Sequence, residues 1–134
     1  MKKIEHIGIA VKDIEASNKL FTKIFGKENY KAEVVESNGV ITSFFKIGEN
    51  KIELVAATNS HSPIHKYLEK NREGIHHLAF DVDDIYSEMK RLKNEGIRLL
   101  NESPKIGADK KLICFLHPKD TNGVLIELCQ EIKQ

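Results

Sequence analysis

The chain has 134 residues, of which 40% are hydrophobic and 31% charged, and its formal net charge is +1 at pH 7. This length suits one compact domain with a sizeable core, over residues 1–134, and the composition is that of an ordinary globular protein. Because the charge is balanced and no apolar run approaches bilayer length, we expect neither a nucleic-acid partner nor a membrane partner.

The start of the chain and its cysteines indicate the compartment. Residues 1–4 run directly into a strand-like pattern, with no apolar segment or cleavage signal of a signal peptide, so we expect a cytoplasmic protein. Cys114 and Cys129 lie inside strand-like runs without the spacing of a redox or zinc motif. We therefore interpret them as reduced, structural thiols.

The first module, about residues 1–57, has a pattern typical of one strand, one helix and three further strands. Residues 4–11 form the first predicted strand, and a helix is expected from residue 13 to about residue 25, with Gly26 as its C-terminal stop. The remaining strands are predicted over residues 32–36, 40–47 and 51–56, separated by glycine-containing turns. The order is βαβββ.

A linker with a short helix, about residues 58–73, leads to a second module over residues 74–134. The short helix is expected over residues 64–71, after Pro63. The second module begins with a strand from Gly74, followed by a helix over about residues 84–95. Strands are then predicted over residues 97–100, 112–116 and 124–129, with a loop rich in glycine and lysine at 103–111. The order is again βαβββ.

The two modules repeat in register. Residues 5–14 match residues 76–85 position by position, which aligns His6 with His77. Strand alternation places His77 on the face opposite to the apolar side chains Leu78, Phe80 and Val82.

The last strand of each module repeats as well. Residues 51–55 match residues 125–129, and each copy has a glutamate in the middle of an apolar strand, Glu53 and Glu127. A carboxylate in such a strand is costly to bury unless it is paired, hydrogen-bonded or bound to a metal.

These repeats predict a metal site. If the first and fourth strands of each module are neighbours, His6, His77, Glu53 and Glu127 meet at one place. Two neutral imidazoles and two carboxylates suit one divalent ion, Co, Zn, Ni or Mn, and leave the site formally uncharged. A single histidine or glutamate of this kind is more often a core or surface residue, but four in register favour ligands.

The other histidines have simpler interpretations. His61, His65 and His117 have no partner in the repeat and are expected on the surface. His76 is expected to pack against the helix layer or a strand edge. The lysines of the 103–111 loop, including Lys105 and Lys111, form either a solvated loop or, beside a cleft, a site for phosphates.

The paired modules and their four candidate ligands resemble the vicinal oxygen chelate superfamily, which includes glyoxalases, bleomycin resistance proteins and extradiol dioxygenases. Within it the chain most resembles the methylmalonyl-CoA epimerases. This likeness rests on Gly74-Ile75-His76-His77, on the Phe-Leu-His-Pro-Lys-Asp run at 115–120 and on the Gly-Val-Leu-Ile-Glu-Leu run at 123–128. It implies an α+β, glyoxalase-like fold, in which the two modules form a curved, partly open eight-stranded sheet around the metal.

The resemblance also implies a reaction, a 1,1-proton transfer on an acyl-CoA thioester through a metal-stabilised enolate. Glu127 matches the residue that binds the metal and serves as one base. Some members carry a second glutamate after a Gly-Val pair, whereas Gly39-Val40 is followed here by Ile-Thr-Ser. Glu53 or a water is then the candidate for the second acid/base group. Lys105 and Lys111 are the candidates for binding the substrate.

Two alternatives to the epimerase remain open, and a third is disfavoured. The same ligands suit a lactoylglutathione lyase, or glyoxalase I, which isomerises the methylglyoxal–glutathione hemithioacetal. A non-catalytic protein of this fold would only bind a small molecule. An extradiol dioxygenase, with two histidines, one glutamate and iron, is disfavoured because Glu53 would fill an open position. Exposed sheet edges favour a homodimer.

Overall fold

The computed structural model describes residues 1–132, and these residues form two compact units. Unit 1 contains residues 1–6 together with the chain from residue 77 onward, and unit 2 contains residues 7–76. Among the described residues, no helix has both the length and the apolar character required to span a bilayer.

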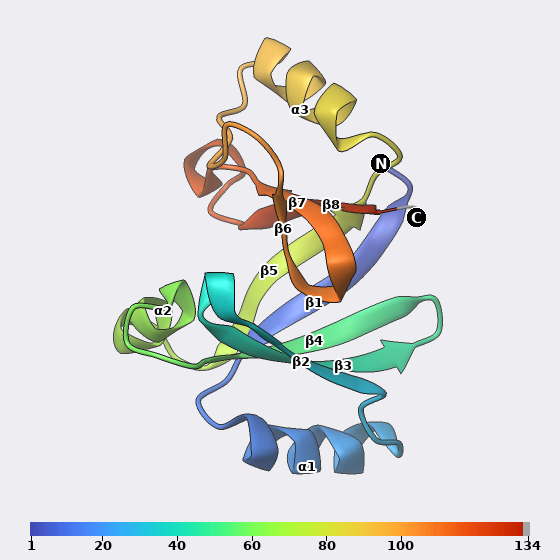
Figure 1. Ribbon diagram of the computed structural model, residues 1–134, viewed down its shortest axis with the longest axis vertical. Coiled ribbons are helices and arrows are strands. Elements are labelled where there is room, and N and C mark those ends of the chain that lie inside the picture. Colours follow the sequence, from blue (N-terminus) through green and yellow to red (C-terminus); the bar gives the residue numbers. More distant parts are fainter. Residues whose placement is uncertain (133–134) are drawn as a thin grey trace. The chain divides into compact units, whose positions relative to one another are not determined.

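Unit 2 is a sheet with two helices. The strands β2 (Lys31–Val35), β3 (Val40–Ile47) and β4 (Asn50–Ala57) are antiparallel, with β3 in the middle. The helix α1 (Ile14–Phe25) packs on β3 and β4, and α2 (Pro63–Lys70) packs on β4 (Figure 1). A short 3-10 helix, Glu36–Asn38, joins β2 to β3.

The ends of α1 follow from its sequence. Asp13 is the N-cap, and its side chain accepts a hydrogen bond from the Ala16 N–H at 3.1 Å. Gly26 ends the helix with a φ of 73°, in the left-handed region that favours glycine. Between these caps, Phe21 and Phe25 pack against Phe45 of β3, with ring centroids 6.5 and 5.3 Å from the Phe45 ring. The predicted helix is confirmed.

The first strand, β1 (Lys3–Ala10), takes part in both units. In unit 1, the Lys2 N–H donates to the carbonyl of Asp81 at 2.8 Å, beside β5 (Gly74–Asp81). In unit 2, the Val11 N–H donates to the carbonyl of Val55 at 2.9 Å, beside β4. The strands of the eight-stranded mixed sheet follow the order β2-β3-β4-β1-β5-β8-β7-β6. The expected neighbourhood of first and fourth strands is therefore confirmed.

Unit 1 places β5 next to β8 (Ile126–Glu131) in parallel, and β8 next to β7 (Lys111–Phe115) in antiparallel orientation. The short strand β6 (Lys105–Ile106) pairs with β7. The helix α3 (Ile85–Asn94) covers one face of β7 and β8, and Asp84 caps its N-terminus (Figure 1).

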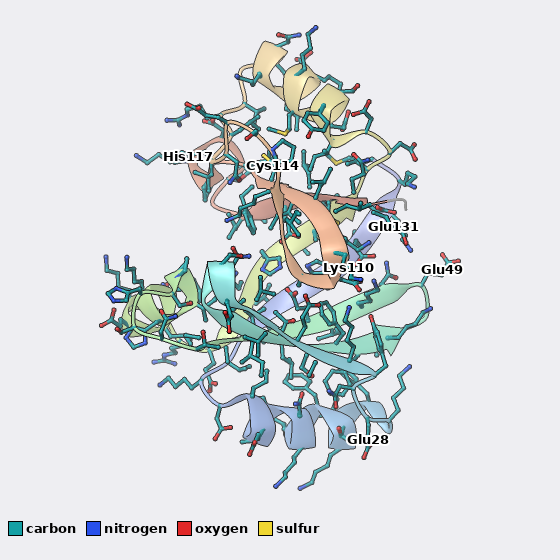
Figure 2. All side chains as sticks on the ribbon, viewed as in Figure 1. Glu28, Glu49, Lys110, Cys114, His117 and Glu131 are labelled. Carbon is teal, nitrogen blue, oxygen red and sulfur yellow. The ribbon has the colours of Figure 1, made fainter. Side chains whose placement is uncertain are left out.

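A hydrophobic core lies beneath α3. It is made of buried side chains from the helix and from the strands, namely Val82, Ile85, Met89, Leu92, Cys114, Leu116 and Leu128. Figure 2 labels Cys114 at its place between β7 and α3. This core uses the face of β8 that carries Leu128, and Val82 joins it directly after β5. The opposite face carries His77 and a smaller apolar cluster of Ala79, Ile113 and Cys129.

The predicted strand at residues 97–100 is wrong. In its place the chain makes a single antiparallel bridge, Leu99 to Leu116, and the edge strand of unit 1 is β6, inside the predicted loop. The side chain of Asn101 explains the interruption, because its Oδ1 accepts the Phe115 N–H at 3.0 Å. A side-chain oxygen thereby takes the hydrogen bond that a continuing strand would have supplied from its backbone.

Candidate metal centre

Three of the predicted ligands come together in unit 1. The Nε2 atoms of His6 and His77 lie 3.1 Å apart. The Glu127 carboxylate lies 3.5 Å from Nε2 of His77 through Oε1 and 3.9 Å from Nε2 of His6 through Oε2. The potential ligand atoms of the three residues all lie within 4.8 Å of one another.

The strand register brings His77 and Glu127 to the same face. Glu127 of β8 is opposite Ala79 of β5 and Phe115 of β7, and Ala79 shares a strand face with His77. The small side chain of Ala79 leaves room for the carboxylate, while the Phe115 ring stands edge-on to His77 with centroids 6.1 Å apart. His6 reaches the same place from β1.

The chemistry of this donor set fits a divalent metal ion. All three residues are buried, with exposed fractions of 5% for His6, 5% for His77 and 6% for Glu127. Two nitrogens bound to one zinc-sized ion at about 2.0–2.1 Å lie about 3 Å apart, which agrees with the separation of the two Nε2 atoms. Imidazole and carboxylate groups are the ligands expected for Zn, Co, Ni and Mn.

The fourth predicted ligand, Glu53, belongs to unit 2. It lies on β4 opposite Phe44 of β3, and its exposed fraction is only 5%. Burial on both sides of an apolar strand is the costly situation anticipated for this carboxylate. Its role as a ligand and as an acid/base group stays a prediction.

Sequence reasoning missed Glu5. This residue precedes His6 on β1, is 4% exposed, and places its Oε1 3.5 Å from the His6 Nδ1. Its other oxygen lies 4.0 Å from the ammonium group of Lys111, which is itself buried. The sequence signal for it is its position: Glu5 directly precedes His6, just as His76 directly precedes His77.

The remaining candidates occupy simpler surroundings. Lys105 is exposed on β6, and its substrate-binding role, like that of Lys111, stays a prediction. His76 packs edge-on against Tyr67 of α2, with centroids 4.7 Å apart, as expected for contact with a helix. His61 and His65 are exposed, while half-buried His117 accepts a hydrogen bond from the Lys119 N–H.

Cys129 lies on β8, two positions after Glu127, and its side chain is buried. Burial, reinforced by the nearby negative charges of Glu127 and Glu5, raises the pKa of the Cys129 thiol. The thiol contacts the carbonyl oxygen of Phe80 at 3.4 Å. Both cysteines are free and buried, as expected.

Comparison with known proteins agrees with this geometry. Residues 5–115 match the model of the glyoxalase/bleomycin resistance protein/dioxygenase superfamily. The ethylmalonyl-CoA/methylmalonyl-CoA epimerase of Cereibacter sphaeroides is 42% identical over 130 residues, covering 96% of this chain and 97% of that protein. A variant of the Streptomyces coelicolor methylmalonyl-CoA epimerase, solved in complex with 2-nitronate-propionyl-CoA, superposes with a TM-score of 0.95 at 35% identity, covering 99% of both chains.

A more distant relative bears on the glyoxalase alternative. A probable lactoylglutathione lyase of Synechocystis is 26% identical over 125 residues, covering 93% of this chain and 92% of that protein. The likeness to the epimerases is thus much stronger over a similar length of chain.

Proposed function

Because this chain belongs to the glyoxalase/bleomycin resistance protein/dioxygenase superfamily and is an isomerase of the epimerase type, we propose that it epimerises methylmalonyl-CoA with one bound divalent metal ion. The observation that carries the proposal is the buried cluster of His6, His77 and Glu127, in a chain that matches acyl-CoA epimerases over almost all of its length. We propose Co, Zn, Ni or Mn as the ion and Glu53 as its fourth ligand.

The chain's own residues would hold the ion. The two imidazoles offer Nε2 lone pairs in their neutral form, and Glu127 supplies negative charge in a place where water does not screen it. An ion bound there would act as a Lewis acid and lower the pKa of the proton on the carbon between the thioester carbonyl and the carboxylate. Adding Glu53 would make the charge of the site neutral, which lowers the cost of burying the ion.

Glu127 is then the base for one face of the substrate. Its carboxylate takes the α-proton, so a C–H bond breaks, an O–H bond forms on Glu127, and the electron pair of the C–H bond moves into the carbonyl group. The second face receives a proton from another acid, which restores a C–H bond with inverted configuration. We propose Glu53 for this acid, with a water as the other candidate.

The CoA part of the proposed substrate carries phosphate groups, and we propose that lysines bind them. Lys105 is exposed on β6 and can offer an ammonium group to phosphate oxygens. Lys111, the other candidate, has Glu5 as a close neighbour.

We also propose that the protein is a cytoplasmic homodimer, which light scattering of the purified protein and cell fractionation would test.

Proton exchange tests the reaction directly. The purified protein, loaded in turn with Co, Ni, Zn or Mn, is incubated with methylmalonyl-CoA in D2O, and deuterium at the α-carbon is followed by NMR. In parallel it is offered methylglyoxal with glutathione. We expect α-deuteration with methylmalonyl-CoA, dependent on added metal, and no lactoylglutathione.

The alternatives give different results in the same experiment. Lactoylglutathione formation without α-deuteration of methylmalonyl-CoA would identify a glyoxalase I. Binding of the thioester without any exchange would identify a non-catalytic protein of this fold. Either result would overturn the epimerase proposal.

A further inference from the structure

We propose that Glu5, held in place by Lys111, is a positioning residue that orients the His6 ring for metal binding. The inference rests on the metal site of the proposed function and adds two residues to it. Neither residue is placed to bind the ion directly, because the ligand atoms within reach of one another belong to His6, His77 and Glu127.

The three side chains form a chain of contacts that leads away from the metal ligands. The Glu5 Oε1 lies 3.5 Å from Nδ1 of His6, while Nε2 of the same ring faces His77 and Glu127. The Glu5 Oε2 lies 4.0 Å from the Lys111 ammonium nitrogen. The carboxylate therefore stands between the back of the imidazole and a cation.

Burial makes these contacts consequential. The side chains of Glu5, His6 and Lys111 are 5%, 6% and 10% exposed. Burying a charged side chain is costly unless an opposite charge compensates it. Little water reaches this position to compete for the contact between the Glu5 carboxylate and Nδ1 of His6. Consecutive residues of a strand normally alternate between a buried and an exposed face, yet Glu5 and His6 are both buried. The Glu5 carboxylate is therefore buried despite the cost of burying a charge.

The contact fixes which nitrogen of His6 carries the proton. A hydrogen bond from Nδ1–H to Glu5 leaves the lone pair of His6 on Nε2, which is the form that binds a metal. Two unprotonated nitrogens 3.1 Å apart would repel each other, so in the metal-free protein the His77 Nε2–H donates to the His6 Nε2. Glu5 thus decides the donor and acceptor roles of both ligands.

The turn before Lys111 positions the Lys111 side chain. The backbone N–H of Gly107 donates to the Lys111 carbonyl at 2.9 Å and closes the turn between β6 and β7. Inside it, Asp109 and Lys110 adopt φ values of 61° and 53°, which non-glycine residues rarely do (Lys110 is labelled in Figure 2). Backbone strain of this kind persists where the surrounding structure over-determines it, as at functional sites.

The repeat does not duplicate this arrangement. The position that corresponds to Glu5 in the second copy is His76, whose ring packs on Tyr67. The sequence therefore places a carboxylate directly before His6 and an aromatic ring directly before His77. We expect the two metal ligands to respond differently when their preceding residues are changed.

The experiment compares metal affinity in four proteins: the unmodified chain, Glu5→Gln, Lys111→Met, and Asp120→Asn as the matched control. Asp120 also forms an ion pair in unit 1, with Arg98, but lies outside the His6 contacts. Co2+ dissociation constants are measured by chelator competition, and the visible absorption of bound Co2+ reports its coordination. Glu5→Gln should weaken Co2+ binding about 10- to 100-fold and shift the spectrum. Lys111→Met should act in the same direction, and Asp120→Asn should do neither.

A second measurement needs no substitution. Nitrogen-15 NMR of the metal-free, unmodified protein should find neutral His6 with its proton on Nδ1 and His77 with its proton on Nε2. The opposite tautomers, or unchanged Co2+ affinity and spectrum in Glu5→Gln, would overturn the inference. Failure of the unmodified chain to bind any of the four metals would instead overturn the metal site of the proposed function.

Discussion

The rings of His6 and His77 meet edge to face, with centroids 5.2 Å apart and an interplanar angle of 87°, although 71 positions separate them in the sequence. Neighbouring strands of one sheet bring the two rings together, and Glu127 completes the cluster. Each of the three residues comes from a different strand. The site therefore depends on the register of β1, β5 and β8.

The two adjacent histidines of β5 should behave in opposite ways. His77→Ala removes a ligand, so metal content should fall from about one ion per chain to a trace. His76→Ala should keep the metal and lose only the ring contact with Tyr67, worth about 0.5–1.5 kcal/mol. Elemental analysis after dialysis measures the first effect and thermal unfolding the second. Metal loss in His76→Ala with retention in His77→Ala would mean that the strand faces are assigned the wrong way round.

We propose two roles for Glu127, as a metal ligand and as the base that removes the α-proton. Glu127→Gln retains the shape of the side chain but not its charge or basicity, so turnover of methylmalonyl-CoA should fall about 100- to 10,000-fold. Metal affinity should fall as well. Glu131→Gln is the control, because Glu131 is exposed at the end of the same strand (Figure 2). Coupled assays and metal titration measure the two effects, and full activity in Glu127→Gln would remove this residue from both roles.

The Arg98–Asp120 ion pair should make the free energy of unfolding depend on pH. The Arg98 side chain donates to both oxygens of Asp120 and its backbone N–H donates as well, which lowers the pKa of Asp120 from 3.8 to about 2. A carboxylate whose pKa is lower in the folded state stabilises above its unfolded pKa and loses that effect as pH falls through the folded value.

Asp120→Asn should therefore lower the Tm at pH 7, and the difference from the unmodified protein should close as pH falls from about 4 to 2. Thermal unfolding followed by circular dichroism measures it. Glu28→Gln, at an exposed residue of unit 2, is the control (Figure 2). A difference in Tm that stays constant down to pH 2 would contradict the assignment of this ion pair.

Gly107 has no room for a side chain. A methyl group there would lie 2.6 Å from Cδ1 of Ile113, which is buried in the core of unit 1. Gly107→Ala should cost about 1–3 kcal/mol in the free energy of unfolding, measured with urea. Ile113→Val removes the clashing atom, so the double variant should cost less than the sum of the single variants. Additive costs would show that the clash is relieved elsewhere.

Much of the fold is predictable because its signals are local. The helix α1 is framed by Asp13 and Gly26, and the strand β3 has the predicted bounds. The opposite orientations of Val82 and His77 follow from simple alternation, since Val82, directly after β5, joins the core under α3 while His77 lies with His6 and Glu127. The internal repeat identified His6, His77 and Glu127 as candidate metal ligands from the sequence alone.

What the sequence did not predict depends on side chains from distant positions. Residues 97–100 are apolar enough for a strand, but Asn101 interrupts the ladder with a side-chain hydrogen bond. Glu5 looks like an exposed residue at the start of a strand. It is buried, with one carboxylate oxygen 4.0 Å from the ammonium nitrogen of Lys111, more than a hundred positions later, and no local pattern contains that information.

The order of the clustered residues along the chain affects biosynthesis, because His6 precedes Glu127 by more than a hundred positions. Chains emerge from the ribosome N-terminus first, so His6 is synthesised before His77 and well before Glu127. Unit 2 is contiguous in sequence and can fold before Glu127 is synthesised, whereas the proposed ion would find all three of its clustered residues only after that. Chains that end before residue 127 would lack one of the three clustered residues, however well unit 2 folds.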